Sequence, residues 1–218
     1  MTKPLTSHDP RWRRLPDRRP TQLIEAALAV FSEHGFDAAK LEDIARRAGV
    51  SKGTIYLYFQ SKDDLFKAVV NDIIAEQLHA AHEGPAPRSA TEALERALRA
   101  NWAFGTDPRF SGWIRILIAE LPKHPALLAY YNEKVIDRAW SLLESIIAGG
   151  VASGEFRPVE PRLAVGFVNS LVVMHRHWVG SGSIRPEYQT RDRQQLIDGI
   201  VEFARAALRN PAYTLPSA

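Results

Sequence analysis

The chain has 218 residues with a net charge of +3, of which 45% are hydrophobic and none is cysteine, so it can bury a sizeable core without disulfides or thiolate chemistry. No apolar run is long enough to cross a bilayer and no signal-peptide core follows the basic N-terminus, so we expect a cytoplasmic protein with no membrane partner. Residues 1–62 hold eleven Lys and Arg against seven Asp and Glu, a local positive excess of the kind that phosphate binding requires.

Residues 1–19 are the first segment, in which five arginines are interspersed with Pro10 and Pro16. We interpret this segment as a basic, flexible arm. Arms of this kind lie along phosphates or enter the minor groove beside a helix-turn-helix. A mostly disordered leader that never touches DNA is an equally good interpretation.

The first folded element is expected over residues 20–34, where apolar residues such as Leu23 and Phe31 recur at helical spacing. Gly35 follows at a position where a helix ends in the left-handed conformation. The same apolar spacing predicts a second helix over residues 41–48.

Gly49 and Ser51 separate this second helix from a short third one. Gly49 is suited to ending a helix, and the Ser51 hydroxyl can accept a backbone N–H and so begin the next. Two helices joined so tightly form a helix-turn-helix, whose second helix enters the major groove and contacts bases from its N-terminal end. A tight helical hairpin that never meets DNA is the alternative.

Residues 20 to about 68 resemble the N-terminal domain of the TetR family of transcriptional regulators, which implies a DNA-binding domain that we place at residues 20–66. Lys40 stands where the family usually has Thr or Ser, so we expect the second helix to lack a side-chain cap and Lys40 to reach a phosphate instead. The resemblance rests on Ala26-Ala27, Phe31, Gly35-Phe36, Leu41-Glu42-Asp43-Ile44-Ala45, Ala48-Gly49-Val50-Ser51-Lys52-Gly53-Thr54-Ile55-Tyr56, Tyr58-Phe59, Ser61-Lys62 and Leu65.

The candidate DNA contacts lie at the start of the third helix and around it. Small and polar residues let the backbone approach the bases, and hydroxyls and charges follow at spacings suited to phosphate oxygens. The predicted set is Lys40, Ser51, Lys52, Gly53, Thr54, Tyr56, Tyr58 and Lys62.

The remaining segments are also expected to be helical, which gives an all-α chain of about nine helices. A long helix begins after Ser61, where Asp64 completes an approximate capping box, and it connects the DNA-binding domain to a C-terminal domain over residues 67–210. A short tail, residues 211–218, follows. The expected helices after the third are 62–81, 91–105, 108–121, 125–152, 161–179 and 192–210.

The C-terminal region resembles, more loosely, the C-terminal domain of AefR-like TetR regulators, which in the family binds effectors and dimerises. The resemblance lies in residues 113–120, Pro125, Tyr130-Tyr131 and residues 154–158. Aromatic and apolar side chains here predict a pocket for a small, mostly apolar effector, with His175 as a polar anchor, although filling of the core is the alternative for each one. The candidates are Trp102, Phe110, Trp113, Leu117, Tyr130, Tyr131, Phe167, Leu171, His175 and Trp178.

A dimer interface is expected on the last two long helices, because two DNA-reading domains need a two-fold axis to read a palindrome. The apolar stripes of these helices predict that they pair with those of a second copy. The candidates are Val165, Val172, Ile197, Ile200, Val201, Ala204 and Leu208.

Neither a metal or cofactor site nor a catalytic site is predicted. His79 and His82 lack a nearby third ligand, and a second pair, His175 and His177, points to different faces of a helix. Three carboxylates have no nucleophile or phosphate-binding loop beside them: Glu120, Glu133 and Asp137.

The prediction is therefore a homodimeric transcriptional regulator, a repressor released by its ligand, that binds a palindromic double-stranded DNA operator. Two alternatives stay open. A non-specific DNA-binding protein without an effector would bind any duplex with a steep salt dependence. A helical enzyme would need a catalytic frame.

Overall fold

The computed structural model describes residues 19–82, 85–110, 112–180 and 185–212, except for the side chains of residues 77–82. Helices make up most of this part of the chain, and its one extended pairing is an isolated antiparallel bridge between Phe156 and Arg209. The all-α prediction is confirmed. The predicted arm as far as residue 18, the tail from residue 213, and the side chains of His79 and His82 lie outside the described residues.

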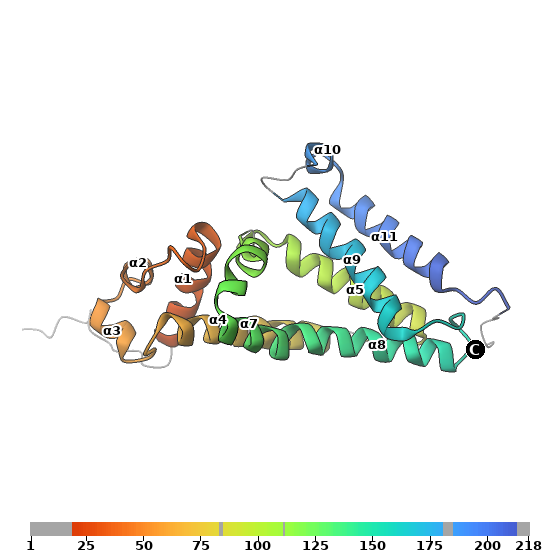
Figure 1. The fold of residues 1–218 in the computed structure, drawn as a ribbon, viewed down its shortest axis with the longest axis horizontal. Coiled ribbons are helices and arrows are strands. Elements are labelled where there is room, and N and C mark those ends of the chain that lie inside the picture. Colours follow the sequence, from red (N-terminus) through yellow and green to blue (C-terminus); the bar gives the residue numbers. More distant parts are fainter. Residues whose placement is uncertain (1–18, 83–84, 111, 181–184, 213–218) are drawn as a thin grey trace, which may run out of the picture.

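The N-terminal end of the molecule, at the left of Figure 1, is built from four helices, and the local signals that predicted their ends are present. Gly35 and Gly49 have φ angles of 87° and 66°, which end the first two helices. Ser61 Oγ accepts a hydrogen bond from Asp64 N (3.0 Å) at the start of the long fourth helix. The helices are α1 (Arg19–His34), α2 (Leu41–Arg47), α3 (Lys52–Tyr56) and α4 (Lys62–His82).

The segment after α5 (Ala90–Thr106) is less regular than predicted. The single helix expected over residues 108–121 is wrong, because Gly112 and Pro122 interrupt it and Pro122 can donate no backbone hydrogen bond. The segment is instead a chain of short turns: η3 (Pro108–Phe110, 3₁₀), α6 (Trp113–Arg115), η4 (Ile116–Glu120, π) and η5 (Leu121–Lys123, 3₁₀).

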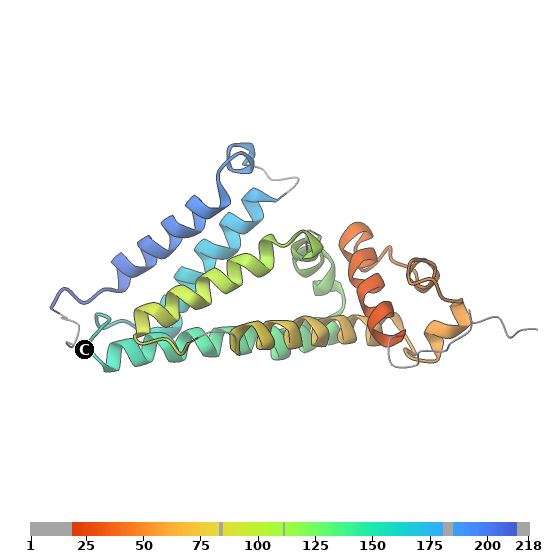
Figure 2. The same ribbon diagram turned by 180° about the vertical axis from the view of Figure 1, so that it is seen from behind.

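In the rest of the chain, α7 and α8 run along the long axis of the molecule in line with α4, whereas α9 and α11 lie side by side and run diagonally to it, as α5 does (Figures 1 and 2). The predicted helix over residues 125–152 is continuous but contains one wide π turn. A short helix, α10, was not predicted. The elements are α7 (Pro125–Tyr131), η6 (Asn132–Ile136, π), α8 (Asp137–Ala152), α9 (Pro161–Val179), α10 (Pro186–Gln189) and α11 (Arg193–Leu208).

The buried apolar residues form two separate clusters. The distal core joins α5, α8, α9 and α11 and consists mainly of Val, Leu and Ile. The head core joins α1 to α4, and it also takes in six residues from the irregular segment and α7: Phe110, Trp113, Ile116, Leu121, Leu127 and Tyr131. Part of the C-terminal half of the sequence thus packs with the N-terminal helices.

Candidate DNA-binding surface and effector region

The turn between α2 and α3 has the geometry that the sequence predicted. Val50 N donates to Ala45 O (2.9 Å) around the left-handed Gly49, which closes α2. Ser51 Oγ accepts a hydrogen bond from Thr54 N (3.2 Å) and lies 2.8 Å from the Thr54 hydroxyl. These contacts fix the first turn of α3, so the helix-turn-helix is present.

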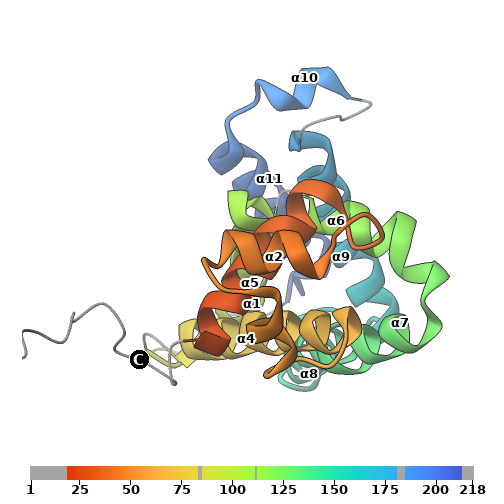
Figure 3. The same cartoon turned by 90° about the vertical axis from the view of Figure 1, so that its left-hand side faces the viewer.

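Burial on one side of α3 leaves its N-terminal end facing solvent. Ile55 is fully buried in the head core, together with Ile44 of α2, so the two helices are held at a fixed angle. Figure 3 looks onto this end of the molecule. The exposed residues of α3 and the turn after it are Ser51, Lys52, Gly53, Tyr56, Leu57 and Tyr58.

Gly53 and Leu57 distinguish this surface from an ordinary helix surface. A Cβ built on Gly53 would meet only Ser51 Oγ, at 3.8 Å, so the packing of the protein itself does not require a glycine there. Leu57 is 81% exposed and was not among the predicted contacts. Its place between Tyr56 and Tyr58 was the signal that could have identified it.

The basic side chains around α3 are engaged in exposed ion pairs. Lys52 pairs with Glu42, which raises the pKa of Lys52 and lowers that of Glu42, and Arg47 Nη1 lies 2.7 Å from Glu33 Oε2. Exposed pairs of this kind contribute little to stability, so a phosphate can displace them. Lys40, exposed at the start of α2, makes no side-chain cap, as expected.

Lys62 has a different role from the phosphate contact that we predicted. Its Nζ donates to three backbone carbonyls, those of Phe36 (2.7 Å), Asp37 (3.1 Å) and Ala39 (3.1 Å). An ammonium group has three N–H donors, and all three are used here. Lys62 therefore holds the α1–α2 loop onto α4, and the prediction of a phosphate contact is wrong for this residue.

The predicted effector residues do not converge on one place. Trp113 stacks on Phe66 of α4 with ring centroids 5.4 Å apart, and with Phe110 and Tyr131 it belongs to the head core, against which Leu117 and Tyr130 pack. Trp102 is in the distal core, and Leu171 packs against that core. The separation arises because α6 and α7 turn back onto α4, away from the distal part of α9.

The remaining predicted effector residues lie elsewhere on α9. His175 and Trp178 form a ring cluster with Tyr188 near α10 (centroids 4.8–5.5 Å apart), and Nδ1 of His175 lies 2.8 Å from Leu171 O. This contact uses Nδ1 and not Nε2, so the role of His175 as a polar anchor stays a prediction. Phe167 is 65% exposed on the outer side of α9, so its assignment to an internal pocket is wrong.

The residues predicted for the dimer interface are buried inside the protomer. They pack between α5, α8, α9 and α11 in the distal core, so the prediction is wrong for these residues: Val165, Val172, Ile197, Ile200, Val201, Ala204 and Leu208. An apolar stripe identifies the buried face of a helix without saying which neighbour covers it. The outer faces of α8, α9 and α11 carry other large apolar side chains, namely Leu142, Leu163, Phe167, Met174 and Phe203.

The α1–α2 loop is joined to the irregular segment by polar contacts. Buried Glu120 accepts a hydrogen bond from Asp37 N (2.7 Å) and lies against Gly35, where a Cβ would come within 2.3 Å of Oε1. The Asp37 carboxylate contacts His124 Nε2 (2.6 Å) and Lys123 Nζ (3.3 Å). These hydrogen bonds and the positive charge of Lys123 lower the pKa of Asp37.

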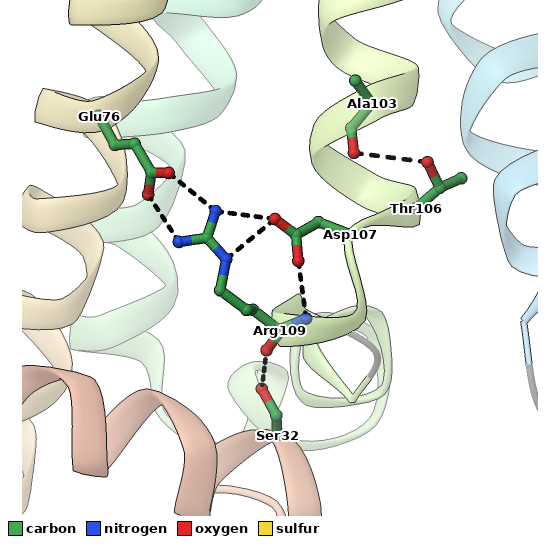
Figure 4. Close-up of polar contacts among 6 residues, drawn as sticks. All are labelled: Ser32, Glu76, Ala103, Thr106, Asp107 and Arg109. Carbon is green, nitrogen blue, oxygen red and sulfur yellow. Dashed lines mark hydrogen bonds and ion pairs between the residues drawn. The ribbon is translucent and has the colours of Figure 1, made fainter.

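A second group of polar contacts joins α4, α1 and the end of α5 (Figure 4). Arg109 binds both carboxylate oxygens of Glu76 on α4 (2.8 and 3.2 Å) and also Asp107 (2.7 Å). The carbonyl of Arg109 accepts a hydrogen bond from Ser32 Oγ of α1 (2.8 Å). The pKa of Arg109 is raised by its two carboxylates, and that of Asp107 is lowered. The DNA-binding helices are thereby tied to the residues that follow α5.

Residues for other kinds of chemistry are not assembled. In the ranges that the structure describes, no three His, Cys, Asp or Glu side chains gather where they could hold a metal ion. None of the described helices is both long and apolar enough to cross a membrane.

Comparison with known proteins places both halves of the chain. Residues 23–69 match a family model described as bacterial regulatory proteins of the tetR family, and residues 85–192 match one described as a tetracyclin repressor-like C-terminal domain. The HTH-type transcriptional activator FasR of Mycolicibacterium smegmatis is 30% identical over 210 residues, which cover 94% of this chain and 90% of FasR. The matched models do not name the AefR-like group, so that part of the resemblance stays a prediction.

Two solved structures are similar to the chain over most of its length. The transcriptional regulator FadR from Bacillus subtilis, in complex with stearoyl-CoA, is 26% identical, with a TM-score of 0.67 over 86% of this chain and 98% of FadR. A regulator from Saccharomonospora viridis in complex with choline has a TM-score of 0.72 at 19% identity, over 88% of this chain and 98% of that one, and shares the fold.

Proposed function

Because the chain belongs to the TetR family of transcriptional regulators, we propose that it is a ligand-released repressor that binds a palindromic DNA operator as a homodimer in the cytoplasm. The observation that carries the proposal is the N-terminal end of α3. It is exposed, it is held from behind by Ile55, and its Gly53 leaves room for DNA and not for another part of the protein.

Release by a ligand requires that the effector bind the DNA-incompetent arrangement better than the DNA-bound one. The contacts of Asp37 and Arg109 support such coupling, because they tie the α1–α2 loop and α1 to residues 107–124. The relatives bound to stearoyl-CoA and to choline support a small-molecule effector.

Binding of a specific operator is tested with Gly53→Ala. Alanine is the better helix former by about 0.5–1 kcal/mol, and nothing in the protein obstructs the new methyl group, so we expect equal or higher stability. The methyl group should nevertheless weaken operator binding, because it faces the DNA. Gly149→Ala on α8, where a Cβ also meets nothing within 4 Å, controls for the effect of the substitution on stability only, because Gly149 lies two turns after Leu142 on the face proposed below for the dimer.

The measurement is footprinting on genomic fragments with purified protein, followed by competition against scrambled duplex. A two-fold symmetric footprint and a loss of operator affinity in Gly53→Ala without a loss of stability support the proposal. Equal binding of the scrambled duplex would instead favour the non-specific DNA-binding protein.

The homodimer is proposed to form through the outer faces of α8, α9 and α11. Exposed large apolar side chains in one region mark an interaction site, and Phe167 and Phe203 are 65% and 63% exposed. Phe167 also lines an open groove, together with Trp140, Glu160, Arg162, Leu163, Gly166 and Ser170.

Sedimentation of Phe167→Glu tests this face. We expect a charged residue there to shift the protein from dimer to monomer and to weaken operator binding. Ile118→Glu is the matched control, since Ile118 is 64% exposed but lies on η4, and it should remain dimeric. A wild type that is monomeric at micromolar concentration would overturn the proposed dimer.

A further inference from the structure

Arg176 of α9 is directed inward and has no anionic partner in the part of the chain that the structure describes. Its Nη1 donates to Asn101 O (3.2 Å) and Asn101 Oδ1 (2.9 Å) on α5. Its alkyl stem lies over Gly105, where a Cβ would come within 1.8 Å of Arg176 Cδ. The missing side chain at Gly105 thus provides the space in which the arginine sits.

Arg99, on the same helix as Asn101, shows how a paired arginine looks in this protein. Its guanidinium contacts Asp198 Oδ1 (2.6 Å) and Glu95 Oε1 (2.9 Å), and the pKa of Arg99 is raised. Among the described residues no carboxylate comes within 4 Å of Arg176, and burial lowers its pKa. A guanidinium has five donors, and the bonds described for Arg176 use Nη1 alone. Its Nε and Nη2 are therefore available to a ligand.

Two further donors belong to the same region, from the side of the head core. Trp113 Nε1 is buried with no acceptor, and the Tyr131 ring lies 6.5 Å from the Trp113 ring. The Tyr131 hydroxyl is near Trp113 Nε1, but the geometry between them does not make a hydrogen bond. Burial raises the pKa of Tyr131, so its hydroxyl keeps its proton. Tyr131 is also close enough to Arg176 for the guanidinium charge to offset part of this rise in pKa.

A buried donor without an acceptor, as Trp113 Nε1 is, destabilises a protein unless something else satisfies it, and a partly buried cation without a counter-charge is also unfavourable. One negatively charged acceptor would serve all three groups. A carboxylate fits a single arginine better than a phosphate dianion does, because it brings one charge and matches the guanidinium in a bidentate manner.

We propose that Arg176, Tyr131 and Trp113 bind the carboxylate of an amphipathic monocarboxylic acid, which is the effector of this regulator. The inference deepens the proposed function and rests on it. The acid spans the two cores, because Arg176 is on α9 whereas Trp113 and Tyr131 pack with the head core. The affinity for the acid therefore depends on how α9 lies relative to the head core. A ligand whose affinity differs between two arrangements of the protein shifts the equilibrium between them, and regulation by an effector requires such a difference.

The test compares acids with neutral partners of the same shape on the full chain without DNA. The probes are octanoate and octanamide, decanoate and decanamide, benzoate and benzamide, with inorganic phosphate as a bare anion. Calorimetry on wild type should give an acid that binds roughly tenfold or more tighter than its amide, as a charge-assisted pair implies. Arg176→Met should abolish that preference, and Arg99→Met should keep it.

The thermal stability of the variants without any probe is a second measurement, and it distinguishes a ligand-binding arginine from one that only stabilises the fold. Removing a half-buried charge that has no carboxylate partner should leave the Tm of Arg176→Met equal to or above that of wild type. Removing Arg99, which has two carboxylate partners, should lower it. Gly105→Ala keeps the charge but displaces the stem, so it should weaken binding of the acid. If Arg176→Met does not fold, Arg176→Lys should retain only part of the preference, because it lacks the guanidinium fork.

Several outcomes would overturn the inference: no acid binds wild type, acid and amide bind alike, phosphate alone binds as well as the acids, or Arg176→Met keeps the preference for acids. Failure of the proposed function is separate, since it would appear as the absence of a symmetric footprint while acids still bind. An acid that binds but leaves operator affinity unchanged would overturn its role as effector.

Discussion

The head core and the distal core differ in what they are made of and in how far along the chain they reach. The head core is rich in aromatic rings. The ring centroids of its contacting aromatic pairs lie 5.3–6.1 Å apart, and these pairs link Phe31, Phe36, Phe66 and Trp113. The distal core is mainly aliphatic, and all its residues except Phe156 come from four long helices. Of the two, only the head core joins the DNA-binding helices to residues that follow α5.

Because of this difference, residues 108–136 pack with the DNA-binding helices as well as with the rest of the C-terminal half. The segment contacts α1 and α4 through the rings of the head core and through Arg109, and it contacts the α1–α2 loop through Glu120. A change in the effector region can therefore reach the DNA-binding surface without unfolding either core.

The largest effect is expected from a charge placed in the distal core, compared with a charge placed on the exposed side of the same helix. Val201→Asp puts an unpaired charge among fully buried aliphatic residues and should cost more than about 4 kcal/mol, unfolding the distal core. Phe203→Asp, two residues along on the exposed side of α11, should leave the fold intact and weaken only self-association. Circular dichroism melting with sedimentation tests both, and a stable, folded Val201→Asp monomer would mean that α11 is packed differently.

The next largest effect is expected from Trp113→Ala, which tests whether Trp113 packs with the DNA-binding helices. Since Trp113 stacks on Phe66, we expect a loss of about 3–5 kcal/mol in unfolding free energy, with weakened operator binding. Trp178→Ala, in the cluster near α10, should spare operator binding. Urea unfolding and fluorescence anisotropy with labelled operator would measure both quantities.

Lys62 and Lys40 should separate structural from phosphate-binding lysines within the head. Lys62→Met leaves three carbonyls without their donor and should cost about 1–3 kcal/mol, with no change in the salt dependence of DNA binding. Lys40→Met should leave stability unchanged and reduce the slope of log K against log salt by about 0.9. The reverse pattern would restore Lys62 as a phosphate contact.

The smallest expected effect is the pH dependence of the contact between the α1–α2 loop and η5. The folded-state pKa of Asp37 is lowered by hydrogen bonding to His124 and Lys123. Ionised Asp37 therefore stabilises the fold fully above its ordinary pKa, and this contribution is lost as pH falls through the lowered value. Melting curves between pH 6 and pH 3 should show a slightly smaller acid destabilisation for Asp37→Asn, and identical curves would show that the contact contributes nothing.

Signals within a few residues of each other predicted the structure well. Gly35 and Gly49 gave the ends of α1 and α2, Ser51 gave the start of α3, and Lys40 gave the missing cap of α2. These features depend on local backbone geometry, which a short stretch of sequence determines.

Features that depend on tertiary contacts were not predictable in the same way. The carbonyls that bind Lys62 are more than twenty residues away, and nothing in the sequence around Lys62 indicates them. The stripe that contains Val201 was assigned to a second copy because periodicity cannot tell an internal neighbour from an external one. Arg176 was missed for the same reason, since a cation near the end of α9 gives no sign of whether it faces α5 or solvent.

The shared head core also sets where this regulator can be divided and recombined. A hybrid joined in the loop before α5 would carry Phe66 from one parent and Trp113 from the other, so two unrelated surfaces would have to stack. A hybrid that takes residues 19–136 as one unit keeps the stack together but divides the distal core, because its α5 would then pack against α8, α9 and α11 of the other parent. Neither junction leaves both cores intact, so new DNA specificity requires residues of the second parent to be matched across whichever core is divided.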